Sequence, residues 1–192
     1  MPPKPKITKT MILNAVLEIT RNTGFESVNA RSIAEYLCCS TRPIFTCYAN
    51  MEELKKEFLL FAFAFYEKFV SIYEKDTDTE AYLVLPLSYL EFAKKETFLF
   101  KLLFINDMDL HIMQSGDFYQ EVGNQKKAEK FSQMIGVSLE QGKEIFLDLF
   151  LYTHGMAVLV ATDKLFLDKD DQEKRIKCIL FALKTQWETR HE

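Results

Sequence analysis

A short stretch of the chain, CSTRPIFTCYANMEEL at residues 39–54, gathers side chains that could recognise a nucleic acid. Arg42 is the strongest candidate for reading a base, because a guanidinium can donate two hydrogen bonds to O6 and N7 of guanine. A phosphate contact or a solvated charge is the alternative for the same side chain. If Ser40 caps a helix that begins at Thr41, Pro43 falls in the first turn, where backbone N–H groups have no intrahelical acceptor. The stretch is therefore predicted to be a short helix that tolerates its proline.

Two earlier helices must position this one. The first should end at Gly24, with Phe25 folding back as the apolar residue beyond the cap. The second has Asn29 as its N-cap. Its apolar residues follow helical spacing for about nine residues. The apolar stripes are Ile12, Ala15, Val16 and Ile19 in the first helix and Ala30, Ile33, Ala34 and Leu37 in the second. Residues 38–40 then leave room for a tight turn alone.

The third helix completes a helix-turn-helix pattern. Ile44 and Tyr48 lie one turn apart and can anchor this helix to the first two. The opposite side is then directed away from the small core and toward a partner. Its side chains are Thr41, Arg42, Phe45 and Thr46. A short helix, a tight turn and a second short helix with an outward polar face are typical of proteins whose second helix enters the major groove of DNA.

The charge of the chain differs between its two parts. The net charge is −4, which at first argues against a nucleic acid as partner. Residues 1–51, however, hold six Lys or Arg against three Glu, so they carry +3 and the remaining 141 residues carry −7. A small basic region on a large acidic body fits a protein that touches phosphates at one end, although chance asymmetry explains the same count.

The stretch ILNAVLEITRNTGFESVNARSIAEYLCCSTRPIFTCYANMEELKKEFL resembles the DNA-binding domain of TetR/AcrR-type bacterial transcriptional regulators. The motifs that carry the resemblance, within roughly residues 7–60, are TGF, SIAEYL, CSTRPIFTCY and NMEELKKEF. The resemblance implies a homodimeric repressor of a palindromic double-stranded operator, with two recognition helices in successive major grooves. It also implies a larger helical carboxy-terminal domain that binds a small effector and dimerises.

This reading divides the chain into a helix-turn-helix DNA-binding domain at 1–50 and a helical effector-binding and dimerisation domain at 51–192. The residues predicted to contact DNA are Asn29, Arg31, Thr41, Arg42, Pro43, Phe45, Thr46, Cys47 and Lys55.

Two positions depart from the family pattern. Where the family usually has glycine in the turn, this chain has Cys38, so either this residue adopts a strained positive φ or the turn differs. Where the family commonly has tyrosine, this chain has Phe45, which lacks the hydroxyl and offers apolar contact instead.

The body of the chain is predicted to be helical, which makes the whole an all-α protein. Hydrophobic residues make up 48%, and there are 17 Phe against 6 Gly and 5 Pro, a balance that favours long helices. Helices are expected at 51–75, 80–95, 97–105, 117–135, 142–163 and 170–189. The first of these carries Phe58, Phe61, Phe65 and Phe69 on one face and enough other apolar residues to be buried on more than one side.

The many phenylalanines suggest a pocket as well as a core. Packing explains most of them, but some could line a site for an apolar or aromatic effector, because such sites have mostly hydrophobic walls. The residues predicted to line it are Phe61, Phe65, Phe69, Phe92, Phe104, Phe150 and His154. A helical interaction protein without a pocket is the alternative.

The last two long helices are predicted to form a homodimer. The segment FLYTHGMAVLVATDKLF resembles the family's penultimate helix, which often carries a His-Gly pair like His154 and Gly155. Glycine inside a helix costs about 1 kcal/mol relative to alanine, which makes sense if another helix must approach closely there. The last helix has an apolar stripe of Ile176, Ile179, Leu180, Leu183 and Trp187. A four-helix interface between two subunits could bury both faces; a monomer that folds them inward is the alternative.

Other functional classes fit less well. The histidines are His111, His154 and His191, and no nucleophile, phosphate loop or metal-ligand spacing accompanies them, so we expect no enzyme, metal or cofactor. A redox-responsive regulator that uses Cys38, Cys39 and Cys47 remains an alternative. The start of the chain lacks a signal peptide, and its longest apolar run is too short for a membrane span. We therefore expect a soluble cytoplasmic protein with reduced thiols.

Overall fold

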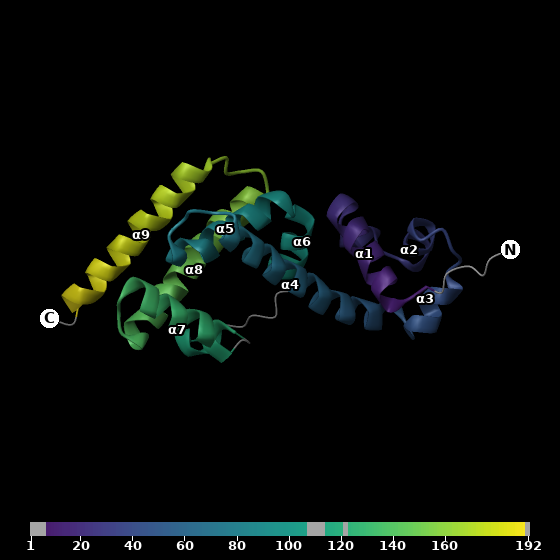
Figure 1. The fold of residues 1–192 in the computed structure, drawn as a ribbon, viewed down its shortest axis with the longest axis horizontal. Coiled ribbons are helices and arrows are strands. Elements are labelled where there is room, and N and C mark those ends of the chain that lie inside the picture. The colour runs from purple at the N-terminus through teal and green to yellow at the C-terminus, as the bar shows by residue number, and fades with distance from the viewer. Residues whose placement is uncertain (1–6, 107–113, 121–122, 191–192) are drawn as a thin grey trace. The chain divides into compact units, whose positions relative to one another are not determined.

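The computed structural model describes residues 7–106, 114–120 and 123–190, and within these ranges it contains helices and no strand (Figure 1). The predicted all-α class is confirmed. The chain forms two compact units: residues 1–68 with 96–107, and residues 69–95 with 108–192. Helix α4, Met51–Lys75, is continuous and passes from the first unit into the second. The division therefore differs from the sequence-based boundary at residue 50.

The first unit is a small helical cluster. It contains α1 (Lys9–Thr23), the 3-10 turn η1 (Phe25–Ser27), α2 (Ala30–Tyr36), α3 (Arg42–Cys47), the first part of α4, and α6 (Thr97–Lys101) with the π-helical turn η2 (Leu102–Asn106). Its core holds side chains with no exposed surface. These are Ile12, Val16, Ile33, Ile44, Leu54 and Phe58. The start of α4 therefore belongs to this core.

The end of α1 follows the prediction. Gly24 terminates the helix with φ 87°, and its N–H donates to the Thr20 carbonyl. A Cβ at Gly24 would lie 3.3 Å from the Phe98 ring of α6, so glycine also permits this close approach. Phe25 folds back and stacks on Phe58 with ring centroids 5.6 Å apart and nearly parallel planes. Glycine and phenylalanine thus fix where α1 stops and how the chain turns.

An ion pair links α1 to the start of α6. Arg21 donates from Nε and Nη2 to the two carboxylate oxygens of Glu96, at 2.8 and 2.7 Å. The Glu96 side chain is 8% exposed, and Arg21 also pairs with Glu18 at 3.0 Å. These hydrogen bonds raise the pKa of Arg21, with that to Glu96 contributing most. The bidentate pair ties a segment from beyond residue 95 into the first unit.

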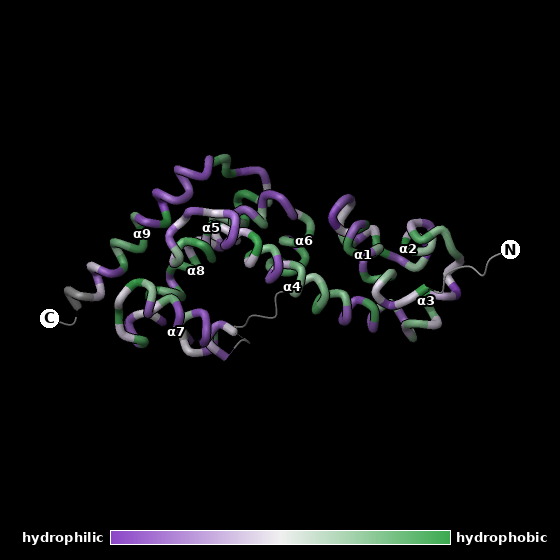
Figure 2. Tube along the Cα trace, viewed as in Figure 1, coloured by the Kyte–Doolittle hydropathy of each residue, from purple (hydrophilic) through white to green (hydrophobic). Residues whose placement is uncertain are grey.

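The second unit is built around α8 (Leu139–Ala161). The helices α5 (Ala81–Lys95), α7 (Asn124–Ile135) and α9 (Lys169–Arg190) all pack against it. In Figure 2, α5 and α8 are largely apolar, whereas the first half of α9 is mainly hydrophilic. Most helices lie within a few residues of their predicted bounds. The helix expected at 117–135 was wrong at its start, where the 3-10 turn η3 (Ser115–Gln120) precedes α7.

Aromatic rings fill the second unit. Phe118 lies 4.9 Å from Phe150 and 6.1 Å from Phe146, measured between ring centroids. Phe131 extends the cluster at 5.4 Å from Phe146, and Phe150 stacks on His154 at 5.7 Å. Most of these rings are buried or half-buried, as the core-packing interpretation predicted.

The prediction that α4 is buried on more than one side was wrong. Its buried residues form one stripe at intervals of four: Leu54, Phe58, Ala62 and Tyr66. Leu60 is 75% exposed and Phe63 is 37% exposed. Of the predicted phenylalanine face, Phe58 is fully buried and the others are half-buried, because the core contacts α4 along one row of side chains.

One helix among the described residues, α8, is long and apolar enough to cross a membrane. Core helices of soluble proteins pass the same test. In this structure α5, α7 and α9 pack against α8.

Candidate nucleic-acid interface

The start of α2 is fixed by its N-cap, as predicted. The Asn29 side-chain oxygen accepts hydrogen bonds from the N–H groups of Arg31 and Ser32, at 3.0 and 3.1 Å. The Ser32 hydroxyl in turn accepts from the Asn29 N–H at 3.0 Å, which completes a reciprocal capping box. Asn29 was predicted to contact DNA, but its side-chain oxygen accepts hydrogen bonds from within the protein.

The turn between α2 and α3 has the geometry that glycine usually provides. The Cys39 N–H donates to the Ala34 carbonyl at 2.9 Å and the Cys38 N–H donates to the Glu35 carbonyl at 3.0 Å, the bonding pattern of a Schellman motif. Cys38 occupies its left-handed position with φ 50°. Of the two alternatives for this turn, the strained positive φ is the one observed.

Helix α3 begins one residue later than predicted. Thr41, not Ser40, is the N-cap, and it has helical backbone angles with no side-chain cap bond. Pro43 lies in the first turn, as predicted, so it removes no intrahelical hydrogen bond. Ile44 is fully buried and Tyr48 is 2% exposed, which confirms both as the anchors of the helix.

The anchors turn the opposite side of α3 to solvent. Arg42 and Thr46 are exposed, and the Phe45 side chain is 51% exposed. Thr46 donates its hydroxyl hydrogen to the Arg42 carbonyl at 3.0 Å. Thr41 is half-buried beside this face. The side chains predicted to face a partner are thus largely brought together on one short helix.

The positive charges of this region fall into two groups. Lys9 pairs with Glu57 at 2.6 Å, and Arg21 pairs with Glu96, so both are neutralised within the protein. Among the described residues, no carboxylate lies within ion-pair distance of Arg31 or Arg42, and both are exposed. Lys4 and Lys6 lie outside the described residues. Of the basic residues that gave residues 1–51 their positive charge, the two described ones that keep an exposed guanidinium without an ion pair are Arg31 on α2 and Arg42 on α3.

Two other residues that were predicted to contact DNA, Cys47 and Lys55, are half-buried and contact other parts of the first unit. Cys47 is half-buried, with its sulfur 4.0 Å from the Ile7 carbonyl oxygen. Lys55 is half-buried, with its ammonium 5.7 Å from the centroid of the Phe25 ring. The next residue, Lys56, is exposed at the same end of α4.

Sequence reasoning missed one exposed aromatic residue. Tyr36, the last residue of α2, is 52% exposed. The signal was present, because Tyr36 lies outside the apolar stripe formed by Ala30, Ile33, Ala34 and Leu37. An aromatic residue off the buried stripe of a short helix adds to the exposed apolar surface of the first unit.

The residues predicted to line an effector pocket lie in both units. Phe61, Phe65 and Phe104 belong to the first unit, where Phe104 packs edge-on against Tyr66 at 5.0 Å. Phe65 lies near the Arg21 guanidinium, 5.6 Å from ring centroid to Cζ. The remaining four are in the second unit: Phe69, Phe92, Phe150 and His154.

Within the second unit, these four form two pairs. Phe69 of α4 meets Phe92 of α5 edge-on at 5.2 Å, and Phe150 stacks on His154. The His154 Nδ1 is 2.9 Å from the Tyr89 hydroxyl, and burial lowers the pKa of His154. The neutral imidazole can accept the hydroxyl hydrogen at this nitrogen.

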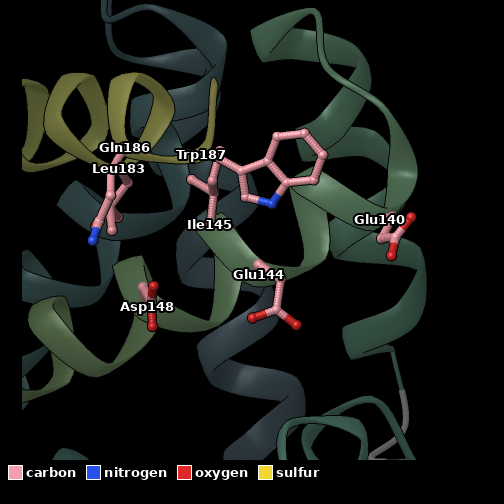
Figure 3. Close-up of a pocket in the computed structure, with 7 residues that line it drawn as sticks. All are labelled: Glu140, Glu144, Ile145, Asp148, Leu183, Gln186 and Trp187. Atoms are coloured by element: carbon pink, nitrogen blue, oxygen red, sulfur yellow. The ribbon is translucent and has the colours of Figure 1, made fainter. Parts of the chain in front are cut away.

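Three grooves on the second unit lie elsewhere. Figure 3 shows one of about 300 Å³ between α8 and α9, with the carboxylates of Glu140, Glu144 and Asp148 along α8 and Trp187 reaching over from α9. Ile145 and Leu183 supply its apolar surface. Two further grooves border α9. None of the seven predicted effector residues lines these three grooves.

The outer face of α8 is apolar and open. Leu151 is 52% exposed and Leu159 is 43% exposed, and Gly155 lies between them at intervals of four residues. A Cβ at Gly155 would meet no described atom within 4 Å, so none of the helices that the structure describes approaches closely there. On α9, Ile176 and Leu180 of the predicted stripe are buried, while Phe181 is 74% exposed. The α9 stripe thus folds partly inward.

Comparison of the sequence with protein-family models and with curated proteins found no match.

Proposed function

We propose that this chain is a sequence-specific DNA-binding transcriptional regulator, a repressor of the TetR/AcrR type that acts as a homodimer on a palindromic operator. The observation that carries the proposal is the outward face of α3, where unpaired Arg42 lies beside exposed Phe45 and Thr46 on a helix anchored by Ile44 and Tyr48. A short, well-anchored helix that presents an unpaired arginine suits the major groove.

The test is salt-dependent binding to DNA. The purified protein should bind a fragment from around its own gene, or a duplex selected from a random library, and affinity should fall steeply as salt rises. Arg42→Ala should weaken binding to the selected duplex more than to random DNA, by about 1 to 3 kcal/mol. Equal losses of affinity for the selected duplex and for random DNA would show that Arg42 contacts a phosphate and does not read a base. Absence of salt-sensitive binding to any duplex would refute the function.

The homodimer is proposed through α8 and α9. Support comes from the open stripe of Leu151, Gly155 and Leu159, which no other helix in the described part of the chain covers. A second copy could lay the same stripe against it around a twofold axis. Gly155→Leu should shift sedimentation toward the monomer, because its side chain would fill the space of close approach. The control Gly116→Ala changes a glycine in open space and should leave the mass unchanged.

Control by a small apolar or aromatic effector is the third part of the proposal. We place the effector at the aromatic residues of the second unit, near Phe69, Phe92 and the Phe150–His154 pair. Because α4 continues from Phe69 back to the first unit, an effector that prefers a shifted α4 would lower DNA affinity. Phe69→Trp should weaken the effector response in a screen of aromatic compounds, whereas Phe166→Trp, at an 82% exposed site, should not.

The cell compartment and the control by redox chemistry are separate questions. A DNA-binding regulator of this type acts in the cytoplasm, and we propose that location. Cys38 is exposed and Cys39 is half-buried, so the redox-responsive alternative remains testable. Mild oxidant would then lower operator affinity in the wild type and not in Cys38→Ser, whereas an unchanged affinity would leave effector control.

A further inference from the structure

We propose that Phe45 reads the C5 methyl group of a thymine in each operator half-site, next to a guanine that Arg42 binds. The inference rests on the proposed DNA-binding function and names the kind of sequence that the interface selects. It starts from the most exposed apolar side chain of α3.

The direction of Phe45 follows from the anchors of its helix. Ile44 and Tyr48 are buried one turn apart, so the residue between them that follows Ile44 must point outward. Among the described residues, no aromatic ring stacks on Phe45 and the ring keeps half of its surface in solvent. Covering this ring would remove apolar surface from water, so it favours a partner with apolar surface of its own.

The major groove offers such a group at one base. Guanine presents two acceptors, cytosine presents an amino donor, and adenine presents one donor and one acceptor, whereas thymine presents a methyl group beside its O4 acceptor. A phenyl ring against a donor or acceptor would leave that group without a hydrogen bond, which is costly. Since Phe45 has no polar atom in its ring, the thymine methyl is the group that it can contact without this loss.

The neighbours of Phe45 determine where the thymine lies. Arg42 precedes Phe45 by three residues and shares its exposed face, and Thr46 uses its hydroxyl hydrogen on the Arg42 carbonyl. Three residues of α-helix span about 4.5 Å, and base pairs are stacked about 3.4 Å apart. The thymine is therefore expected within one or two base-pair steps of the guanine.

Replacement of thymine by uracil tests the inference, because uracil lacks only the methyl group. The full-length protein first selects a duplex from a random library, and each thymine of one half-site is then changed singly to uracil. For the wild type, one substitution near a guanine should weaken binding by roughly three- to fivefold, the value of one buried methyl. For Phe45→Ala, the thymine and uracil duplexes should bind equally well.

A matched control removes another exposed phenylalanine. Phe166→Ala should retain the full sensitivity to uracil, because Phe166 lies in the second unit and outside the proposed interface. Phe45 is half-exposed, so Phe45→Ala should fold, and its far-ultraviolet circular dichroism is expected to match the wild type.

The outcomes separate the inference from the function beneath it. Salt-sensitive, sequence-specific binding that ignores every uracil would overturn the thymine contact and leave the DNA-binding function standing. If Phe45→Ala is still sensitive to uracil, another residue contacts the thymine methyl group, and the inference about Phe45 is overturned. Selection of no duplex at all would overturn the DNA-binding function itself.

Discussion

Both units of the molecule have an apolar core, but they differ in the contacts that are most prominent between and at the ends of their helices. In the first unit, short helices are fixed by directional hydrogen bonds. Asn29 and Ser32 cap α2, and the Ala49 N–H donates to the Glu53 carboxylate at 2.7 Å at the start of α4. In the second unit, long helices meet through aromatic rings such as Phe118, Phe150 and Phe146.

This difference indicates what each unit can do. Directional bonds permit few arrangements, so they hold the exposed side chains of α3 at fixed spacing, as recognition of a rigid surface requires. Apolar ring contacts are less directional than hydrogen bonds, so a cluster of them tolerates more rearrangement. Sequence recognition is therefore expected from the first unit and ligand accommodation from the second.

The largest effect is expected where the second unit is tightest. A Cβ at Gly142 of α8 would lie 2.5 Å from Ser132 Cβ and 3.0 Å from Ser132 Cα of α7. Gly142→Ala should lower the free energy of unfolding by about 2 to 3 kcal/mol, because backbone must move. Urea unfolding measures this, with Gly116→Ala as control. A loss below about 0.5 kcal/mol would show that the unit repacks more easily than its geometry indicates.

The ion pair of the first unit should give the next effect. Arg21→Ala leaves the buried Glu96 carboxylate without its partner, and we expect a loss of about 1 to 2 kcal/mol in unfolding free energy. The value is below that of a fully buried pair because the Arg21 side chain is 36% exposed. Arg21→Lys keeps the positive charge but cannot donate the two parallel hydrogen bonds of the guanidinium. Its unfolding free energy should therefore lie between those of the wild type and Arg21→Ala. If lysine and alanine behave alike, the two-pronged geometry contributes nothing.

A smaller effect should depend on pH. Burial lowers the pKa of His154, so the unfolded chain binds more protons than the folded one between the two pKa values. Stability is then fully present above the unfolded value of about 6.5 and is lost as the pH falls through the folded pKa. Urea unfolding from pH 7.5 to 5 measures this. The slope should flatten in His154→Gln and persist in His191→Gln.

The smallest effect concerns the turn of the first unit. Cys38 holds φ 50° in the place of a glycine, so Cys38→Gly should raise the unfolding free energy by about 0.5 kcal/mol after the added flexibility of the unfolded chain is counted. Cys38→Ala keeps the Cβ and should bring no gain. Thermal unfolding of the three proteins makes the comparison. Equal gains for glycine and alanine would trace the effect to the thiol instead.

Local signals made much of the first unit predictable. Gly24, Asn29 and Pro43 each act through the backbone within a few residues, and all three lie where the sequence placed them. The start of α3 was misplaced by one residue because Thr41 caps it without a side-chain bond, which leaves no signature. Tyr36 could have been found from its position off the buried stripe.

Long-range contacts could not be predicted in the same way. The pairing of Arg21 with Glu96 joins residues 75 positions apart, and nothing near either residue signals the other. The return of residues 96–107 to the first unit was missed for the same reason. The buried stripe of α4 was also misassigned, since a helix with apolar residues on several sides does not reveal which side meets the core.

The return of α6 to the first unit has a consequence for how such a protein can be rearranged by recombination. A gene segment ending at Lys68 would encode α1 to α3 and the first part of α4 without Phe98, which lies against Gly24, and without Glu96, which binds Arg21. A single crossover would therefore join one protein's α1 to another's α6, with mismatched partners. Exchange of the unit between relatives needs two segments to be inherited together, so α1 and α6 are expected to change in concert.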